Sequence, residues 1–346
     1  MDRLQQTSLA LGPASGRFDC HVVEPGRAVP SLEEDVREGL LFAPRSLPPK
    51  YFYDARGSVL FDRICETPEY YPTRTEDALL ARCADAVIAE ARPDHVIELG
   101  SGASRKTRHL LDAVERAGLR HCRYWPFDVC EPMLREAGER LLARHPWLRI
   151  DALVGDYLAG LDGLPRPEGR RLFVFLGSTI GNFEPQQARD FLAGLAACMG
   201  GRDSLLLGAD RVKDPSVLEA AYNDAAGITA DFNLNLLRVL NRELAADFEL
   251  GAFRHRAVYD PSLQRIEMHL VSTCDQVVKF GHLGESLRLE AEEPILTEIS
   301  RKFTRGSVDQ LLHDAGLTAF AHHEPENGYF SLIHAQLSRV CHKHPL

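Results

Sequence analysis

Residues 96–113 have the types and the spacing of a ligand-binding turn. Glu98 closes a short apolar run, and Gly100 and Gly102 follow with one residue between them. Glycines at such a turn let a ligand approach the backbone, and the NH groups at the start of a following helix can bind it. The segment therefore predicts a ligand site at a strand–turn–helix junction, and a tight turn without a ligand is the alternative.

The spacing of the glycines separates two classes of ligand. Dinucleotide sites carry G-x-G-x-x-G, in which the third glycine packs the helix against the strand. Arg105 stands at that third position, and the acid Glu98 precedes the first glycine. Both features disfavour a nicotinamide-dependent oxidoreductase. The E-x-G-x-G pattern instead resembles the opening motif of class I S-adenosylmethionine-dependent methyltransferases, with another nucleotide-type site still open.

An alternating series of strands and helices must position these residues. Apolar runs end at Asp128 and at Asp156, and two further runs lie within residues 170–183 and 203–212, with helical patterns between them. Such alternation predicts a parallel sheet with helices on both faces, and ligands bind beyond the carboxyl ends of its strands. We expect an α/β fold with a seven-stranded class I methyltransferase (Rossmann-like) sheet.

Two segments interrupt the alternation and predict a second domain. Residues 20–74 are rich in aromatic and turn residues, and residues 213–303 carry helices and strands of their own. We assign residues 75–212 with 304–346 to the methyltransferase domain. The other two segments are expected to form an α+β substrate-binding domain that caps the active edge of the sheet, since domain junctions commonly hold small-molecule sites.

Composition and charge limit the class of partner. The 346 residues carry a formal net charge of −10, and no basic run exceeds two residues, which disfavours nucleic acid. The eight cysteines form no C-x-x-C pair and the fourteen histidines no H-x-x-x-H pair, so no metal site is indicated. No apolar stretch suits a signal peptide or a membrane span. We expect a cytoplasmic monomer that acts on a small molecule, without a membrane or a metal.

Longer motifs in both predicted domains make the resemblance specific. Residues 51–76, 175–185, 221–248 and 296–303 are similar to the histidine-specific methyltransferase family, and the match spans roughly residues 40–340. The resemblance implies S-adenosylmethionine as cofactor and S-adenosylhomocysteine as its product. It further implies L-histidine as the substrate, methylated on its α-amine to the trimethylated betaine hercynine, as in ergothioneine biosynthesis.

The same resemblance implies a set of cofactor contacts on the sheet. They are Gly100, Gly102, Lys106, Asp128, Asp156 and Tyr157. The two strand-end acids would accept the ribose hydroxyls and the adenine amino group, respectively. Tyr157 stands where the family usually has phenylalanine, and it keeps an aromatic face beside the base.

Four residues are implied at the amino-acid end of the substrate. Tyr70, Asn182 and Tyr222 match positions that hold the carboxylate and the amine through neutral donors. Tyr53 matches a position close to the reacting nitrogen. Tyr53 and Asn182 are thus the expected catalytic residues, which would steer the lone pair of the amine.

Three further residues are implied at the side chain of the substrate. Glu298 and Ser300 match contacts to the imidazole, and Met268 matches a neighbour of the ring. A carboxylate can accept an imidazole N–H, and a lysine or an aliphatic substrate could not reproduce that pairing as well. A wrong ligand would leave the buried carboxylate unpaired, so selectivity is expected to be steep.

Each of these assignments has an ordinary structural alternative. Tyr70 and Met268 could be core residues, Asn182 a turn residue, and Glu298 a solvated strand position. Two functional alternatives also stay open. One is a methyltransferase of the same fold for another small amine or amino acid, and the other is a noncatalytic S-adenosylmethionine-binding regulator.

Overall fold

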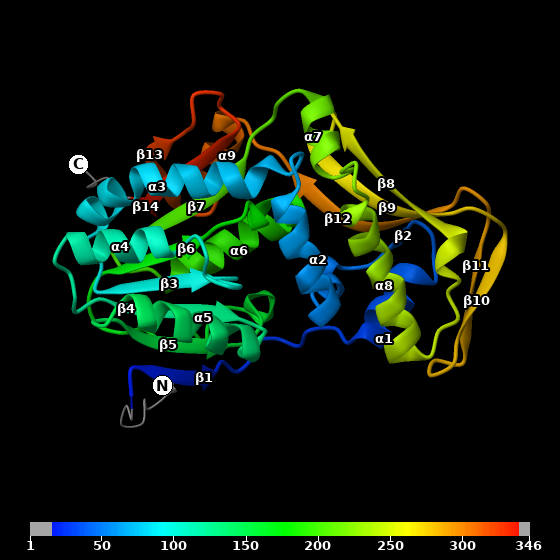
Figure 1. The fold of residues 1–346 in the computed structure, drawn as a ribbon, viewed down its shortest axis with the longest axis horizontal. Coiled ribbons are helices and arrows are strands. Elements are labelled where there is room, and N and C mark those ends of the chain that lie inside the picture. Colours follow the sequence, from blue (N-terminus) through cyan, green and yellow to red (C-terminus); the bar gives the residue numbers. More distant parts are fainter. Residues whose placement is uncertain (1–15, 339–346) are drawn as a thin grey trace, which may run out of the picture.

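A computed structural model describes residues 16–338 of the chain, in two layered parts that lie side by side (Figure 1). The larger part is built on an eight-stranded sheet of order β1-β5-β4-β3-β6-β7-β14-β13. Its strands are β1 (Phe18–Val22), β3 (His95–Leu99), β4 (Arg123–Asp128), β5 (Arg149–Val154), β6 (Arg171–Phe175), β7 (Ser204–Asp210), β13 (Leu317–His323) and β14 (Phe330–Leu337). The strands pair in parallel except for β14, which runs antiparallel to β7 and β13. This sheet confirms the expected α/β class I methyltransferase fold.

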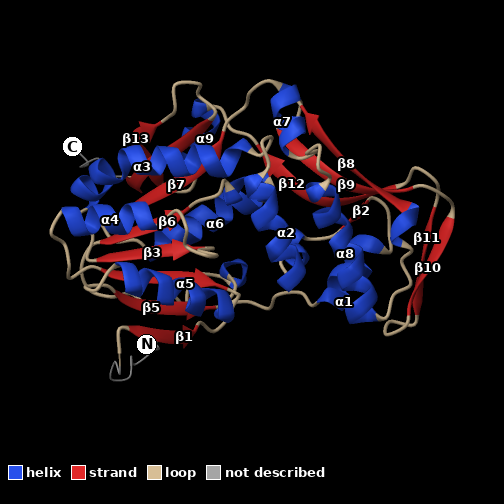
Figure 2. Ribbon diagram, in the orientation of Figure 1, coloured by secondary structure: helices blue, strands red, loops and turns tan. Residues whose placement is uncertain are grey.

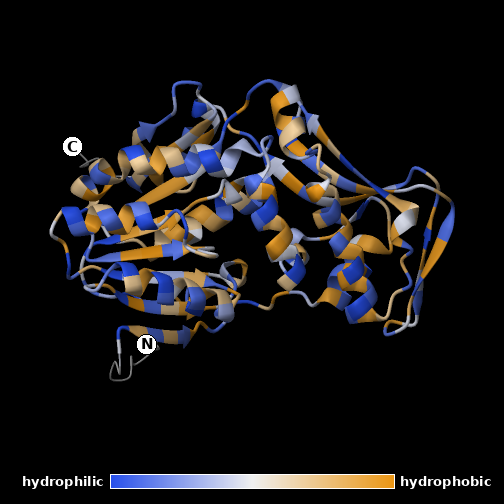
Figure 3. Ribbon diagram, in the orientation of Figure 1, coloured by the Kyte–Doolittle hydropathy of each residue, from blue (hydrophilic) through white to orange (hydrophobic). Residues whose placement is uncertain are grey.

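Helices cover both faces of the sheet because its strands are apolar on both sides. In β3, Val96 packs toward α3 (Tyr71–Ala91) and α4 (Arg108–Arg116), whereas Ile97 packs toward the opposite face. The first face also carries α5 (Glu131–Arg144), and the second carries α6 (Pro185–Cys198) and α9 (Arg305–Asp314). Hydrophobic residues dominate these strands, while the helices alternate hydrophobic and hydrophilic residues (Figure 3). Such strands are typical of parallel sheets buried on both faces.

Strand β1 makes the sheet one strand larger than the expected seven. It pairs in parallel with β5, with Cys20 opposite Ala152. Residues 20–22, which we assigned to the capping domain, therefore lie in the larger sheet. The segment 339–346, assigned to the methyltransferase domain, and residues 1–15, where we expect no signal peptide, lie outside the described residues.

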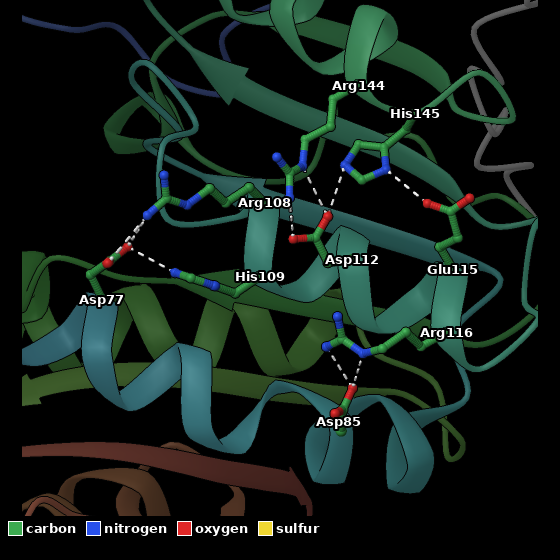
Figure 4. A network of polar contacts seen from close by, with 9 residues as sticks. All are labelled: Asp77, Asp85, Arg108, His109, Asp112, Glu115, Arg116, Arg144 and His145. Atoms are coloured by element: carbon green, nitrogen blue, oxygen red, sulfur yellow. Dashed lines mark hydrogen bonds and ion pairs between the residues drawn. The ribbon is translucent and has the colours of Figure 1, made fainter.

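Polar contacts on the outer side tie the helices of the first face together (Figure 4). Asp77 of α3 lies 3.0 Å from Nε2 of His109, and Asp85 lies 2.7 Å from Arg116. On the other flank Arg144 pairs with Asp112 at 2.8 Å. Exposed pairs of this kind contribute little individually, so we interpret them as structural contacts of the helix layer.

The second part, which we call the cap, comprises residues 31–70 and 213–303 and has its own core. Its sheet has the order β2-β12-β9-β8, and the hairpin of β10 and β11 extends beyond it (Figures 1 and 2). The strands are β2 (Arg45–Ser46), β8 (Phe253–Asp260), β9 (Arg265–Ser272), β10 (Gln276–Phe280), β11 (Glu285–Leu289) and β12 (Pro294–Arg301). The α-helices are α1 (Leu32–Asp35), α2 (Ala55–Glu66), α7 (Pro215–Ala221) and α8 (Ile228–Leu244).

Short helical turns complete the fold. They are the π-helical η1 (Val36–Leu40) and the 3-10 turns η2 (Pro49–Phe52), η3 (Tyr157–Ala159), η4 (Thr179–Asn182) and η5 (Leu250–Ala252). The carboxyl ends of β3, β5 and β6 point toward the cap (Figure 1), which is where a parallel sheet binds its ligand. Within residues 16–338, no helix combines the length and the hydropathy needed to cross a membrane.

Candidate active site

The turn after β3 adopts a backbone that glycine favours. Gly100 has φ +65° and Gly102 has φ +50°. The N–H of Gly100 donates to the carbonyl of Phe127 at 2.8 Å, and the N–H of Gly102 donates to Oδ2 of Asp128 at 2.9 Å. The turn is thus folded over the end of β4. Between the two glycines, the buried hydroxyl of Ser101 has no hydrogen-bond partner among residues 16–338, which leaves a polar group for a ligand.

Two carboxylates lie at the carboxyl ends of the paired strands β4 and β5. Asp128 also accepts from the N–H of Cys130 at 3.1 Å, and Asp156 accepts from the N–H of Leu158 at 2.7 Å. A carboxylate offers about four acceptor positions, so these backbone bonds orient each group and leave capacity for a ligand. Both side chains are half-buried.

Tyr157 lies beside these acids and against the glycine turn. A Cβ added to Gly100 would lie 3.3 Å from Cε1 of Tyr157. Burial, followed by the charges of Asp128 and Asp156, raises the pKa of Tyr157 above its ordinary value. The ring packs edge-on against Phe127, with centroids 6.5 Å apart. The predicted cofactor residues other than Lys106 are therefore neighbours at one edge of the sheet.

Lys106 forms an ion pair with the fully buried Glu76 of α3. Both oxygens of Glu76 also accept from the N–H of Gly177, at 2.9 Å each, at the end of β6. The lysine side chain keeps 21 % of its surface exposed. The pair ties α3 to the ends of β3 and β6, and a contact from Lys106 to the cofactor stays a prediction.

Glu98, the acid of the E-x-G-x-G motif, is buried and stabilises the turn through hydrogen bonds. It accepts from the hydroxyl of Thr107 at 2.6 Å and from the hydroxyl of Tyr124. Burial raises the pKa of Glu98 to about 7, against the lowering effect of these two hydrogen bonds. Glu98 therefore fixes the segment that follows the glycines.

Five aromatic rings of the cap pack against one another. Tyr53 packs edge-on against Phe61 at 5.7 Å and against Phe232 at 5.9 Å between ring centroids. Tyr70 packs against Phe61 at 6.2 Å and against Tyr222 at 6.1 Å. We call these five residues the aromatic cluster. Tyr53 keeps 45 % of its residue surface exposed, while its ring packs against Phe61 and Phe232.

A β-bulge in β12 decides where Glu298 and Ser300 lie. Leu296 pairs with His269 and Glu298 pairs with Met268, so Thr297 is an extra residue without a partner on β9. The extra residue shifts the alternation of the strand, because side chains directly opposite each other share a face. Glu298 therefore lies on the face of Met268, which belongs to the apolar core of the cap.

The pKa shifts of three tyrosines show which residues lie near Glu298. Burial is the main cause of the raised pKa of Tyr53 and of Tyr70, and the charge of Glu298 adds to both. The pKa of Tyr222 is raised in the same way, although Lys302 opposes the shift. The ionised form of Tyr157 would also raise the pKa of Tyr53. The structure thus brings the predicted imidazole contact, the three tyrosines and the cofactor side of the site together.

Burial raises the pKa of Glu298 itself to about 7, with Lys302 acting in the opposite direction. A carboxyl with this pKa changes its charge within the physiological range. It is therefore well suited to respond to a ligand that brings an N–H donor.

Asn182 reaches the cap because η4 lies directly against β12. A Cβ added to Gly181 would lie 2.7 Å from the carbonyl oxygen of Arg301, so glycine permits this close approach. Asn182 is half-buried, and within the described range its side-chain amide makes no protein hydrogen bond. The hydroxyl of Tyr70 also makes none there. Both groups could therefore donate to a ligand.

The hydroxyl of Tyr222 is engaged by the protein itself. It donates to Oγ of Ser300 at 2.8 Å and accepts from Nζ of Lys302 at 3.0 Å. Tyr222 thus lies among the predicted substrate contacts, but its hydroxyl donates to Ser300 in this structure.

Sequence reasoning missed several residues that support the site. They are Asp210, Lys213, Asn233, Thr297 and Lys302. Lys302 had a usable signal, since it follows Glu298 and Ser300 at two-residue spacing. The others had none, because their roles come from contacts across long sequence separations; Thr297, for example, donates to Oδ1 of Asn233 of α8 at 2.8 Å.

Metal ligation is not part of the described geometry. Among residues 16–338, no three side chains of His, Cys, Asp or Glu are grouped closely enough to hold a metal ion.

Comparison with known proteins covers both parts of the chain. A model of the family described as histidine-specific methyltransferase, SAM-dependent, matches residues 32–337. The chain is 50 % identical over 290 residues to histidine N-alpha-methyltransferase of Mycolicibacterium smegmatis. The aligned region covers 84 % of this chain and 90 % of that protein. It is 46 % identical over 302 residues to the protein of the same name from Mycobacterium tuberculosis, covering 87 % and 94 %.

A third relative extends the comparison to fungi. The chain is 36 % identical over 285 residues to ergothioneine biosynthesis protein 1 of Neurospora crassa. The aligned region covers 79 % of this chain and 31 % of that protein. The range matched by the family includes every site residue described above.

Proposed function

Because this chain belongs to the histidine-specific, S-adenosylmethionine-dependent methyltransferase family, we propose that it methylates the α-amine of L-histidine. The protein is an S-adenosylmethionine-dependent N-methyltransferase, and S-adenosylhomocysteine is the second product. The proposed final product is the trimethylated betaine, hercynine.

The edge of the sheet fits the cofactor. The two glycines leave backbone uncovered, and the buried hydroxyl of Ser101 lacks a partner in the described part of the chain. Asp128 and Asp156 keep acceptor capacity for the ribose hydroxyls and the adenine amino group, with Tyr157 beside them. When bound, the cofactor supplies a methyl group that its sulfonium has already activated.

The amino-acid end of histidine is assigned to neutral donors. Asn182 and Tyr70 would donate to the carboxylate, since neither donor has a protein acceptor within the described residues. Tyr222 lies beside Tyr70 in the aromatic cluster. Neutral groups orient the substrate without placing another cation next to a sulfonium.

The main tasks of these residues are orientation and the exclusion of water. Holding two reactants in a near-attack geometry can contribute on the order of 7–11 kcal/mol to the barrier reduction. The α-amine must lose a proton before each transfer, and we assign Tyr53 and Asn182 to steering its lone pair. The proton leaves through water.

Repeated methylation places an increasing positive charge next to the cluster. Aromatic faces attract quaternary ammonium groups through cation–π interactions. Tyr53, Phe61 and Phe232 have centroids within 6.0 Å of one another and would accommodate the methylated amine.

The observation that supports histidine most is the bulge in β12. It places Glu298 and Ser300 next to Met268 and the tyrosines, instead of on the opposite face of the strand. A carboxylate and a hydroxyl at this position suit the two nitrogens of an imidazole.

A methyl-transfer assay against all twenty amino acids tests the proposal. Histidine should be preferred in kcat/KM by at least about 100-fold, because other side chains leave the half-buried carboxyl of Glu298 unpaired. Glu298→Ala should lower the activity on histidine and narrow this preference. Equal activity on several amino acids would instead support a methyltransferase for another small amine.

A further inference from the structure

A buried ion cluster lies directly behind the proposed imidazole contacts. It consists of Asp210 at the end of β7, Lys213 three residues later, and Lys302 just after β12. At most 4 % of each side chain is exposed. Two ammonium groups share one carboxylate, and burying an excess charge is unfavourable unless further hydrogen bonds satisfy it. The arrangement of those hydrogen bonds is therefore informative.

The carboxylate of Asp210 has all of its acceptor positions occupied. Oδ1 accepts from Nζ of Lys213 at 2.6 Å and from the N–H of Arg211 at 3.0 Å. Oδ2 accepts from the hydroxyl of Tyr71 at 2.7 Å and lies 2.9 Å from Nζ of Lys302. Four bonds match the four positions that a carboxylate offers. The aspartate therefore holds the ammonium group of Lys302 in one place.

Lys302 in turn uses all three of its donors. Besides Asp210, its ammonium group donates to Oγ of Ser300 at 2.8 Å and to the hydroxyl oxygen of Tyr222 at 3.0 Å. An ammonium group cannot accept a hydrogen bond. The direction of both hydroxyl contacts is thus fixed by chemistry, and each hydroxyl oxygen has one lone pair occupied.

Ser300 is left with one function toward a ligand. Its oxygen accepts from Lys302 and, at 2.8 Å, from the hydroxyl of Tyr222. A hydroxyl has two acceptor positions and one proton. Both positions are occupied, and its own proton has no acceptor within the described residues. Ser300 can therefore only donate.

We infer that Lys302 is a positioning residue that makes Ser300 an obligate hydrogen-bond donor, so that Glu298 and Ser300 bind histidine as neutral imidazole in a single tautomer. This inference rests on the proposed function. Glu298 precedes Ser300 by two residues in a regular stretch of β12, which places their Cα atoms about 6.5 Å apart on one face. One ring nitrogen, unprotonated, would accept from Ser300, and the N–H of the other would donate to Glu298.

The charge of the cluster acts in the same direction. A second cation is disfavoured next to Lys302, which weakens the binding of imidazolium, whereas ionised Glu298 acts in the opposite direction. The opposite direction of the hydrogen bond between Ser300 and the imidazole would have a different consequence. If Tyr222 turned its proton away from Ser300, the serine could accept a hydrogen bond from the ring. The ring would then have to present an N–H to both Ser300 and Glu298.

Nitrogen NMR of the bound substrate tests the inference on the wild-type protein. Histidine labelled with ¹⁵N in the ring would be added to the protein saturated with S-adenosylhomocysteine at pH 6, where most free imidazole is protonated. We expect one protonated and one unprotonated ring nitrogen, in a single tautomer. Two protonated nitrogens, or a mixture of tautomers, would overturn the inference.

Lys302→Met tests the role of the lysine, and Lys213→Met is its matched control. Each substitution removes one ammonium group from Asp210 and leaves the other, but only Lys302 touches Ser300. We expect Lys302→Met to raise the Kd and KM of histidine about tenfold or more and to abolish the single tautomer, with the Kd of S-adenosylhomocysteine within about twofold. Lys213→Met should keep the tautomer.

An unchanged tautomer and histidine affinity in Lys302→Met would contradict the inference, and so would an equal loss of the tautomer in Lys213→Met. If Lys302→Met does not fold, Ser300→Ala removes the same donor and should weaken histidine binding alike. A wild-type protein that binds no histidine would overturn the proposed function and this inference together. Binding of imidazolium would overturn this inference alone.

Discussion

Glu298 shows at the scale of one residue how an environment changes a common side chain. In its local sequence it has the pattern of a solvated strand position, yet in the structure its pKa rises to about 7 from an ordinary 4.5. Desolvation causes this rise, and Lys302 limits it. The same carboxyl is therefore costly to ionise in the free protein and becomes useful when a ligand supplies an N–H.

This pKa predicts a stability difference that depends on pH. Below pH 4.5 the carboxyl is protonated in the folded and unfolded states, and the stability it retains there is lost as the pH rises through 7. Ionised Glu298 then destabilises the fold by on the order of 3 kcal/mol. Glu298→Gln should thus be more stable than wild type at pH 8 but not at pH 4.5, in urea unfolding without ligand. An identical difference at both pH values would contradict the assigned pKa.

Asn182 carries the second prediction at this scale. Asn182→Ala should lower kcat/KM for histidine about 10- to 100-fold, because one hydrogen bond to a charged substrate group is lost. The affinity for S-adenosylhomocysteine should not change. Asn327→Ala, in the exposed loop between β13 and β14, is the control. An Asn182→Ala enzyme with wild-type kcat/KM would remove Asn182 from the site.

At the scale of elements, the site depends on how β12 pairs with β9. Thr297 makes the bulge of β12, and Asn233 of α8 binds its hydroxyl. The sequence could place the strand over this region and, by resemblance, propose Glu298 and Ser300 as contacts. It could not predict the face of the strand, because a bulge depends on the register against β9. Asp210 could not be predicted either, since its partner Lys302 lies 92 positions later in the sequence.

Deletion of Thr297 should return β12 to regular pairing, because the pairs Leu296–His269 and Glu298–Met268 would then follow each other directly. Glu298 and Ser300 should keep the face of Met268, so we expect calorimetry to show binding of both histidine and S-adenosylhomocysteine. Thr297→Val is the comparison, because it keeps the extra residue and removes only the hydroxyl, at about 1–3 kcal/mol of stability. Loss of histidine binding in the deletion variant, with S-adenosylhomocysteine still bound, would show that pairing with β9 does not orient these residues.

At the scale of the whole molecule, the active residues come from two parts of the chain that meet at one edge. The alternating pattern of the sequence was sufficient for the parallel sheet and for a separate segment between β7 and α9. It did not reveal β1, since a five-residue strand is recognised only through its pairing with β5. The ion pair of Asp210 and Lys302 joins β7 to the end of β12 and so connects the cofactor sheet with the cap.

The position of the new methyl groups tests the central claim most directly. The purified protein would be incubated with S-adenosylmethionine and histidine, and the product would be analysed by fragmentation mass spectrometry. The proposed arrangement of cap and sheet predicts mass increases in steps of one methyl group, up to three, all on the α-nitrogen and none on the ring. Methylation of an imidazole nitrogen, or histidine recovered unchanged, would contradict it.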